Sequence, residues 1–246
     1  MSAAPILEIR DLTKRFQGLV SIDRVSFTIG QGEILALIGP NGAGKTTLVN
    51  LISGTLAANE GTISFEGRRI DGLAPYRRAR LGIARTFQVM KPFPSLSALD
   101  NVAVGALFGL QGGVRSREAA RGEARRLLAF TGLGDRADRR ADDLGGPDRK
   151  RLELAKALAL RPRLLLLDEV MAGLNAVEID EVVEVIKQIR GSGITILIIE
   201  HVMKAVRRLA DRVIVLHHGE LIAEGSTDSV FQDPKVIEAY LGKRRA

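Results

Sequence analysis

The sequence predicts an α/β fold in which a parallel β-sheet is covered by helices on both faces. Short, unbroken aliphatic runs alternate with segments of helical periodicity, which is typical of strands that are buried on both sides. These runs lie at residues 34–38, 164–167, 194–199 and 213–216. A glycine-rich loop that ends in Lys-Thr follows the first run directly. The length of 246 residues is enough for one large domain.

The composition is that of an ordinary globular protein, with 46% hydrophobic and 26% charged residues. The chain has no cysteine, which excludes disulfides, thiolate metal sites and cysteine nucleophiles. The N-terminal segment is charged where a signal peptide would be apolar, and no apolar run reaches the ~20 residues that span a bilayer. We therefore expect a cytoplasmic protein. Lysine and arginine exceed aspartate and glutamate by 36 − 29 = 7, but no aromatic residues alternate with the basic clusters, so we expect no nucleic-acid partner.

The remaining elements follow in chain order. Before the first buried run and shortly after it, apolar patterning predicts strands at residues 6–10, 25–29 and 62–65. Residues 45–53 form a predicted helix, and residues 95–161 are mostly helical with glycine and proline breaks at 112–113, 132–134 and 145–147. Helical patterns at 177–190 and 201–210 separate the later strands, and residues 234–241 form a short final helix.

Residues 39–47 fit the phosphate-binding pattern G-x-x-x-x-G-K-[ST], with a strand before it and a helix after it. Glycines let backbone N–H groups surround the phosphates, and the positive end of the next helix faces the same charge. Lys45 is expected to reach the outer phosphates and Thr46 to ligate Mg²⁺. The predicted nucleotide site therefore contains Gly39, Pro40, Asn41, Gly42, Ala43, Gly44, Lys45, Thr46 and Thr47.

The buried run at 164–167 ends in two carboxylates, Asp168 and Glu169. In P-loop enzymes an aspartate at this strand end holds the metal, which predicts Asp168 as a second Mg²⁺ ligand. Glu169 lies one residue further on and can face the γ-phosphate, where it would polarise the attacking water as general base. An ordinary acidic turn is the alternative interpretation.

With these motifs the chain resembles an ATP-binding-cassette (ABC) ATPase along nearly its whole length. Gln88, in RTFQ, matches the family's Q-loop glutamine, which contacts Mg²⁺ and water. His201, after ITILIIE, matches the switch histidine, and Phe16 stands where the family places an aromatic ring under the adenine. The resemblance implies one domain over residues 1–246, with a RecA-like core, an N-terminal antiparallel β subdomain and a helical signature subdomain at about 90–160. It also implies ATP and Mg²⁺ as cofactors, with Glu169, His201 and Lys45 as catalytic residues.

The family's signature segment, usually L-S-G-G-Q, is altered in this chain. The matching residues are Leu144, Gly145, Gly146, Pro147 and Asp148. Glycine replaces the serine, so a hydroxyl contact to a γ-phosphate is missing, and Pro147 removes one N–H donor. Asp148 suits the start of a helix but repels phosphate. We expect weakened recognition of the γ-phosphate at this site.

Segments such as LTKRFQGLVSIDRVSFTI, LDEVMAGLN and VIEAYLG resemble the ATP-binding subunits of branched-chain amino acid importers. The resemblance implies transmembrane permeases and a second, same or related, ATPase in a head-to-tail dimer as partners. It also implies an indirect link to a periplasmic binding protein and a place on the inner face of the cell membrane. A lipopolysaccharide-export ATPase, a stand-alone ABC protein of DNA repair or translation, and a small-molecule kinase are the alternatives.

Overall fold

The computed structural model describes residues 4–87, 92–110, 113 and 116–241. A six-stranded sheet with the order β10-β9-β3-β8-β7-β6 forms its centre. β10 pairs with β9 antiparallel, and the other neighbours pair parallel, which confirms the predicted fold class. The strands are β3 (Ile34–Ile38), β6 (Ile83–Arg85), β7 (Leu164–Asp168), β8 (Thr195–Ile199), β9 (Arg212–His217) and β10 (Glu220–Gly225).

The aliphatic runs are unbroken because both faces of the central sheet are buried. In β3, Leu35 and Leu37 join one hydrophobic cluster, while Ile34, Ala36 and Ile38 join another on the opposite face. β7 and β8 alternate in the same way. A strand with an apolar cluster on each side has no position for a polar side chain except at its two ends. The polar residues therefore collect at the strand ends.

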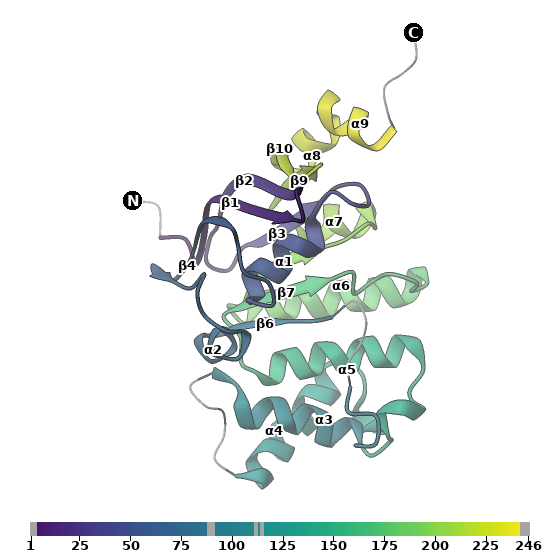
Figure 1. Cartoon of the computed structure of the whole chain (residues 1–246). Coiled ribbons are helices and arrows are strands. Elements are labelled where there is room, and N and C mark those ends of the chain that lie inside the picture. Colours follow the sequence, from purple (N-terminus) through teal and green to yellow (C-terminus); the bar gives the residue numbers. More distant parts are fainter. Residues whose placement is uncertain (1–3, 88–91, 111–112, 114–115, 242–246) are drawn as a thin grey trace.

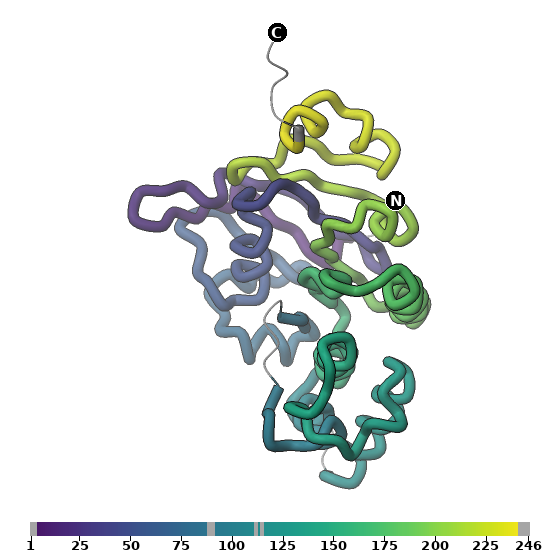
Figure 2. The backbone as a smooth tube through the Cα atoms, turned by 90° about the vertical axis from the view of Figure 1, so that its right-hand side faces the viewer, coloured from purple at the N-terminus to yellow at the C-terminus, as the bar shows by residue number. Residues whose placement is uncertain are grey.

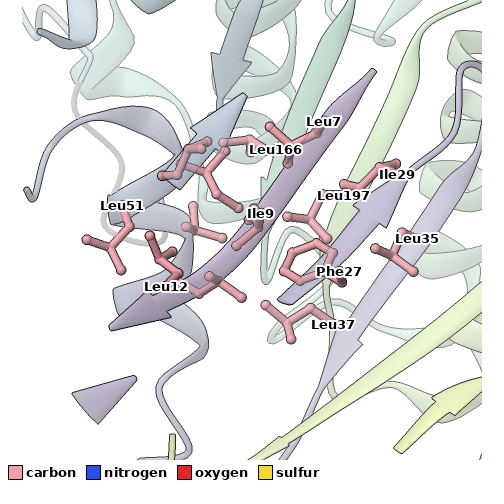
Figure 3. Packing of buried hydrophobic residues seen from close by; sticks show 14 of the residues in the cluster. Leu7, Ile9, Leu12, Phe27, Ile29, Leu35, Leu37, Leu51, Leu166 and Leu197 are labelled. Atoms are coloured by element: carbon pink, nitrogen blue, oxygen red, sulfur yellow. The ribbon is translucent and has the colours of Figure 1, made fainter. Parts of the chain in front are cut away.

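A second, antiparallel sheet covers one face of the central sheet. It has the order β2-β1-β4-β5, with β1 (Leu7–Phe16), β2 (Leu19–Ile29), β4 (Glu60–Phe65) and β5 (Arg68–Arg69). Figure 3 shows Leu7, Ile9 and Phe27 of this sheet beside Leu35, Leu37, Leu166 and Leu197 of the central sheet. Burial of this shared apolar layer holds the two sheets together.

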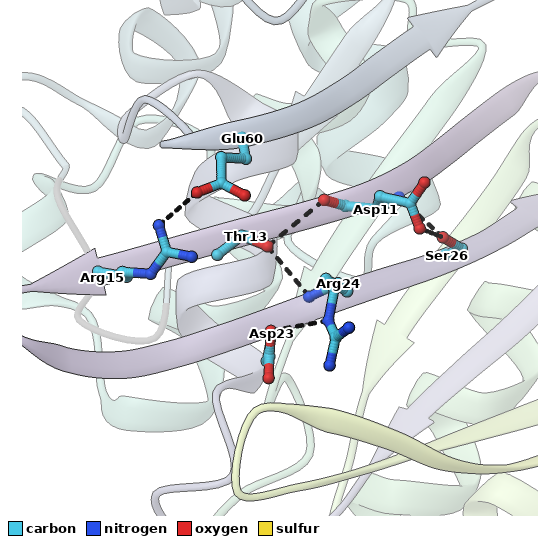
Figure 4. Close-up of polar contacts among 7 residues, drawn as sticks. All are labelled: Asp11, Thr13, Arg15, Asp23, Arg24, Ser26 and Glu60. Atoms are coloured by element: carbon cyan, nitrogen blue, oxygen red, sulfur yellow. Dashed lines mark hydrogen bonds and ion pairs between the residues drawn. The ribbon is translucent and has the colours of Figure 1, made fainter.

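Strands β1 and β2 run further along the chain than their alternating pattern predicts, because β-bulges interrupt the period of two. The register of β1 against β2 shifts on both sides of Leu12, and Asp11 has a φ of 48°. Figure 4 shows the polar contacts at this point: the Asp11 amide donates to Ser26 Oγ (2.7 Å), and the Arg24 amide donates to Thr13 Oγ1 (3.1 Å). The extended hairpin brings Ser21 to the phosphate-binding loop.

The helical region predicted near residues 95–161 contains α3 (Ala98–Phe108), α4 (Arg117–Phe130) and α5 (Gly146–Ala159). Ser97 and Ser116 cap α3 and α4 by accepting backbone N–H groups three residues on. The three helices share a hydrophobic cluster of their own. Both views place this region at the end of the molecule opposite α8 (Thr227–Gln232) and α9 (Pro234–Leu241) (Figures 1 and 2).

The other helices are α1 (Lys45–Ser53), α2 (Pro75–Leu81), α6 (Ala176–Gly191) and α7 (Met203–Leu209). The bounds predicted for α1 and α9 are confirmed. The apolar patterning did not predict β5, β6, β10, α2 or α8, each of which has seven residues or fewer. Among the described residues, no helix has the length and apolar character that a membrane span requires.

Arg78 of α2 fixes the end of α1, although it is only 1% exposed. Its guanidinium donates to the carbonyl oxygens of Leu51 (2.6 Å) and Ile52 (2.8 Å) in the last turn of α1. It also donates to the carbonyls of Asp71 and Leu73. A cation at the carboxyl end of a helix compensates the helix dipole. Arg78 therefore both supplies hydrogen bonds to the last carbonyls of α1 and balances the negative end of its dipole.

We expect Arg78→Met to lower the free energy of unfolding by about 3 kcal/mol, because four buried or partly buried carbonyls lose this donor while the methionine fills the space. Urea denaturation measures this change. Arg78→Lys should recover part of the loss, because one ammonium reaches a subset of the carbonyls. Equal stability of Arg78→Met and the parent protein would show that the carbonyls find other partners.

Candidate functional site

The loop between β3 and α1 is held against the backbone of two other strands. A Cβ on Gly39 (φ 150°) would lie 2.1 Å from the Leu216 carbonyl oxygen, and one on Gly44 (φ 103°) would lie 2.5 Å from that of Ser21. Gly219, in the turn after β9, donates its N–H to the Ala43 carbonyl (3.0 Å). The positive φ values and the lack of space for a Cβ both require glycine at positions 39 and 44.

Lys45 begins α1 and is 6% exposed. Its ammonium donates to the carbonyl oxygens of Gly39 (2.7 Å) and Pro40 (2.9 Å) and is thereby folded back over the loop. Burial lowers the pKa of Lys45, while the charges of Glu169 and Asp168 oppose this effect. The lysine therefore keeps its place through carbonyl contacts and two nearby carboxylates.

A cavity of about 710 Å³ opens in front of the loop. Its volume lies in the range of small-molecule and cofactor sites. Most of its lining is the loop itself, and the rest comes from β2 and from the ends of β7 and β8. The lining residues are Ser21, Asn41, Gly42, Ala43, Gly44, Lys45, Thr46, Thr47, Glu169 and His201. Seven of the nine residues predicted from the phosphate-binding motif thus face one cavity, together with Glu169 and His201.

Asp168 ends β7 and its side chain is 1% exposed. Its amide donates to Thr86 Oγ1 (3.1 Å), and its Oδ2 lies 3.4 Å from Nη2 of Arg85. The other carboxylate oxygen, Oδ1, is buried without a hydrogen-bond partner among the described residues. Burial raises the pKa of Asp168, with Arg85 as the main opposing charge. An unsatisfied buried carboxylate oxygen is unusual and suits a metal ligand.

Glu169 and His201 are 32 residues apart in the chain but meet at the cavity. Glu169 Oε1 and His201 Nε2 are 2.7 Å apart. Glu169 has a φ of 51°, and its amide donates to the carbonyl of Ile199, the last residue of β8 (3.0 Å). Strained backbone of this kind is concentrated at functional sites. The turn after β7 is therefore bent so that the carboxylate faces the residue that follows β8.

Two residues expected at the nucleotide are not placed there by the described structure. Phe16, at the end of β1, is 41% exposed and lies outside the cavity lining, with Nζ of Lys14 5.0 Å from its ring centre. Gln88 lies outside the described residues. Their expected roles remain predictions.

The altered signature segment lies at the start of α5, away from the cavity in front of the P-loop. Leu144 is buried, whereas Gly145 and Gly146 are exposed, and a Cβ on either would meet no described atom within 4 Å. Pro147 occupies the first turn of α5. Asp148 forms an ion pair with Arg136, which offsets the repulsion expected between its carboxylate and a phosphate.

Glu200 was not singled out in the sequence, because it reads as the last residue of an apolar run. It is 1% exposed, and its Oε1 accepts the N–H of Met171 (2.9 Å), so it connects the segment before His201 to the loop after Glu169. Burial raises the pKa of Glu200 to about 7, although the N–H groups of Met171 and His201 and the charge of Lys150 lower it. A glutamate directly before the histidine was the signal that could have identified it.

This pKa makes stability depend on pH. The folded-state pKa of Glu200, about 7, lies above the ordinary value of 4.5, so the folded protein binds more protons between these values. The free energy of unfolding should therefore fall as the pH rises from 4.5 to 7. Glu200→Gln removes this titration. We therefore expect the free energy of unfolding of the variant, relative to that of the parent, to rise by about 3 kcal/mol as the pH increases from 4.5 to 8. Urea denaturation at several pH values measures this difference, and a constant difference would contradict the assignment.

Two known protein families match segments of this chain. A family model described as ABC transporter matches residues 22–172, and one described as branched-chain amino acid ATP-binding cassette transporter matches residues 220–246. The chain is 36% identical to the high-affinity branched-chain amino acid transport ATP-binding protein BraF of Pseudomonas aeruginosa, over 97% of this chain and 98% of the relative. It is also 36% identical to the probable branched-chain amino acid transport ATP-binding protein LivG of Archaeoglobus fulgidus, over 96% and 95%.

Solved structures give the same assignment. The ADP conformation of MJ1267, an ATP-binding cassette of an ABC transporter, superposes with a TM-score of 0.88 at 32% identity, over 98% of this chain and all of the other. The dimeric, post-hydrolysis structure of the cassette MJ0796 bound to ADP and Pi gives a TM-score of 0.82 at 25% identity, over 90% and 98%. The chain therefore belongs to the ABC transporter family and is one of its ATP-binding, ATP-hydrolysing cassettes.

Proposed function

We propose that this cassette energises an importer of branched-chain or related amino acids. The observation that carries the proposal is that Glu169 and His201 face the same cavity as Lys45 and the phosphate-binding loop, within a chain that aligns over nearly its full length with named branched-chain transport ATPases. The match of residues 220–246 to the branched-chain family favours this importer over a lipopolysaccharide exporter.

The loop amides, Lys45 and Thr47 bind the phosphates of ATP in this proposal, and Phe16 stacks on the adenine. The residues fit a Mg²⁺ ion, because the buried Oδ1 of Asp168 lacks a hydrogen-bond partner among the described residues and Thr46, which carries a hydroxyl, lines the cavity. Thr46, Asp168 and Gln88 would hold the ion. When bound, Mg²⁺ would neutralise phosphate charge that develops during hydrolysis.

In the reaction, water attacks the γ-phosphorus of ATP, and ADP and phosphate are released. Glu169 accepts a proton from the attacking water while the oxygen of this water bonds to the γ-phosphorus. The bond between the γ-phosphorus and the β-phosphate oxygen breaks. His201 contacts the γ-phosphate and, through its 2.7 Å contact, orients Glu169. Lys45 stabilises the negative charge on the outer phosphates.

The signature residues are proposed to act on the ATP of a second cassette. Gly145 and Gly146 are exposed at the start of α5, where backbone N–H groups are available to a phosphate on a facing subunit. The ATP-binding cassette MJ0796, 25% identical to this chain, has a dimeric structure. We infer one ATPase domain over residues 1–246, with a helical subdomain at about 90–160. It would work in the cytoplasm, on the inner face of the membrane, with permeases and, through them, a periplasmic binding protein.

We expect Glu169→Gln to bind ATP with the affinity of the parent while kcat for hydrolysis falls roughly 10²–10⁴-fold, because the amide cannot accept the proton of water. Calorimetry measures the binding and phosphate release measures the rate.

In the source organism, loss of the gene should abolish the uptake of leucine, isoleucine and valine. The parental gene should restore this uptake, and the Glu169→Gln gene should not.

Hydrolysis at the parental rate by Glu169→Gln would show that another group activates the water. Normal branched-chain amino acid uptake without the gene would reject the substrate class while leaving the ATPase assignment intact.

Restoring the family's serine should strengthen contact with the partner's ATP. Gly145 has φ −68° and ψ 169°, and a side chain there meets no described atom within 4 Å, so Gly145→Ser is tolerated. We expect the ATP concentration that half-forms the dimer to fall about tenfold, because one hydroxyl–phosphate hydrogen bond contributes roughly 1.5 kcal/mol. Light scattering in the Glu169→Gln background measures it.

Gly145→Ala is the matched control, because it adds the same Cβ without the hydroxyl. If Gly145→Ser and Gly145→Ala dimerise at the same ATP concentration, the hydroxyl has no role at this interface.

A further inference from the structure

We propose that Arg85 is a positioning residue for the Mg²⁺–ATP site, which orients the carboxylate of Asp168 and ties it to the helix that follows the phosphate-binding loop. The inference rests on the proposed function, because it assigns a role toward the metal that Asp168 would hold. Arg85 is not among the described residues that line the cavity, and we do not assign it a catalytic role. In the sequence it belongs to a basic cluster and has no visible partner.

The position of Arg85 follows from the sheet. It is the last residue of β6, which pairs in parallel with β7, so its backbone lies beside Leu166, two residues before Asp168. Its side chain is 10% exposed, and its Nη2 lies 3.4 Å from Asp168 Oδ2. Oγ1 of the next residue, Thr86, accepts a hydrogen bond from the backbone N–H of Asp168 (3.1 Å). The end of β6 therefore supports both the backbone and the side chain of Asp168.

The contact leaves the two carboxylate oxygens of Asp168 in different environments. Oδ2 faces the Arg85 guanidinium, whereas Oδ1 is buried without a hydrogen-bond partner among the described residues. A carboxylate whose rotation is fixed on one side presents its other oxygen in one direction. Groups that orient metal ligands in this way are a general feature of metal sites and influence metal affinity strongly.

Arg85 also reaches the helix that carries Lys45 and Thr46. Its Nη1 donates to Asn50 Oδ1 (2.6 Å) and to Ser53 Oγ (3.1 Å), both in α1. Its guanidinium carbon lies 4.7 Å from the ring centre of Phe87, the residue before Gln88. One planar, multidentate cation thus connects α1 and the end of β7, the described segments that carry the proposed Mg²⁺ ligands Thr46 and Asp168. Lysine, with a single ammonium, cannot satisfy these contacts together.

Packing alone does not account for an arginine at this position. Burial disfavours the guanidinium and lowers its pKa, with the Asp168 carboxylate as the opposing charge. A methionine would fill similar space without this cost, but it would leave the buried Asp168 carboxylate without its opposing charge, which is strongly destabilising. Arg78 offers a contrast in the same part of the fold, because its buried guanidinium donates to the backbone carbonyls of residues 51, 52, 71 and 73 and not to Asp168.

The test compares ATP binding with and without the metal. Calorimetry gives the Kd of the full chain for ATP in EDTA and in Mg²⁺, and their ratio is the gain in affinity due to the metal. We expect Arg85→Met to reduce this gain about tenfold, with an unchanged Kd in EDTA, and Arg85→Lys to retain part of it. Electron paramagnetic resonance of Mn²⁺ bound with ATP should show a matching rise in the Mn²⁺ dissociation constant.

Arg78→Met is the control, because it removes a buried arginine next to α1 that does not touch Asp168. It should lower stability and leave the metal-dependent gain at the parental value. The proposal is overturned if Arg85→Met keeps the full gain, or if it weakens ATP binding equally in EDTA and in Mg²⁺.

If Arg85→Met does not fold, Arg85→Lys and Asn50→Ala decide the question. Asn50→Ala keeps the charge but removes its 2.6 Å anchor, so it should reduce the gain by a smaller factor. An unchanged gain in both variants would reject the proposal. A parent protein that binds no ATP under either condition would instead reject the proposed function.

Discussion

The loop between β3 and α1 lies so close to the backbone of β2 and β9 that Gly39 and Gly44 have no space for a Cβ. This packing fixes the loop before any ligand arrives, because its position is set by carbonyls of Ser21 and Leu216 in other strands. The direction of α1, the placement of Lys45 over the loop and the cavity in front of it all follow from this constraint. A site held in this way pays little reorganisation free energy when an anion binds.

The charges behind the cavity are arranged in opposed pairs. Lys45 faces the carboxylates of Asp168 and Glu169, Asp168 has Arg85 on its other side, and Glu169 contacts His201. The charges of Lys45, Asp168, Glu169 and Arg85 are buried or half-buried, and each would be costly alone. Together they form a region that is close to balanced and able to respond when phosphate and metal add new charges. Glu200, behind His201, couples the ends of β7 and β8 through Met171.

One chain contains only part of the arrangement that the family uses. The signature glycines stand exposed at the start of α5 and do not line the cavity with Lys45. A facing cassette would complete the site, and binding of ATP between the two would then shift the population toward the closed dimer. In the proposed dimer, the missing serine hydroxyl at Gly145 would reduce this preference, while the Arg136–Asp148 pair would limit the effect of the extra carboxylate.

Local sequence patterns were enough to predict the parallel sheet, the phosphate-binding loop and the two carboxylates after β7, because each has a fixed spacing along the chain. Strands buried on both faces read as unbroken aliphatic runs, and the loop needs glycines at set positions. Which distant residues meet depends instead on how the strands are ordered in the sheet. Arg85 and Asp168 are 83 residues apart, and Glu169 and His201 are 32 apart, and these pairs form because the order β8-β7-β6 places the strand ends side by side. The bulges that lengthen β1, and the burial that raises the pKa of Glu200, likewise depend on neighbours that no local pattern specifies.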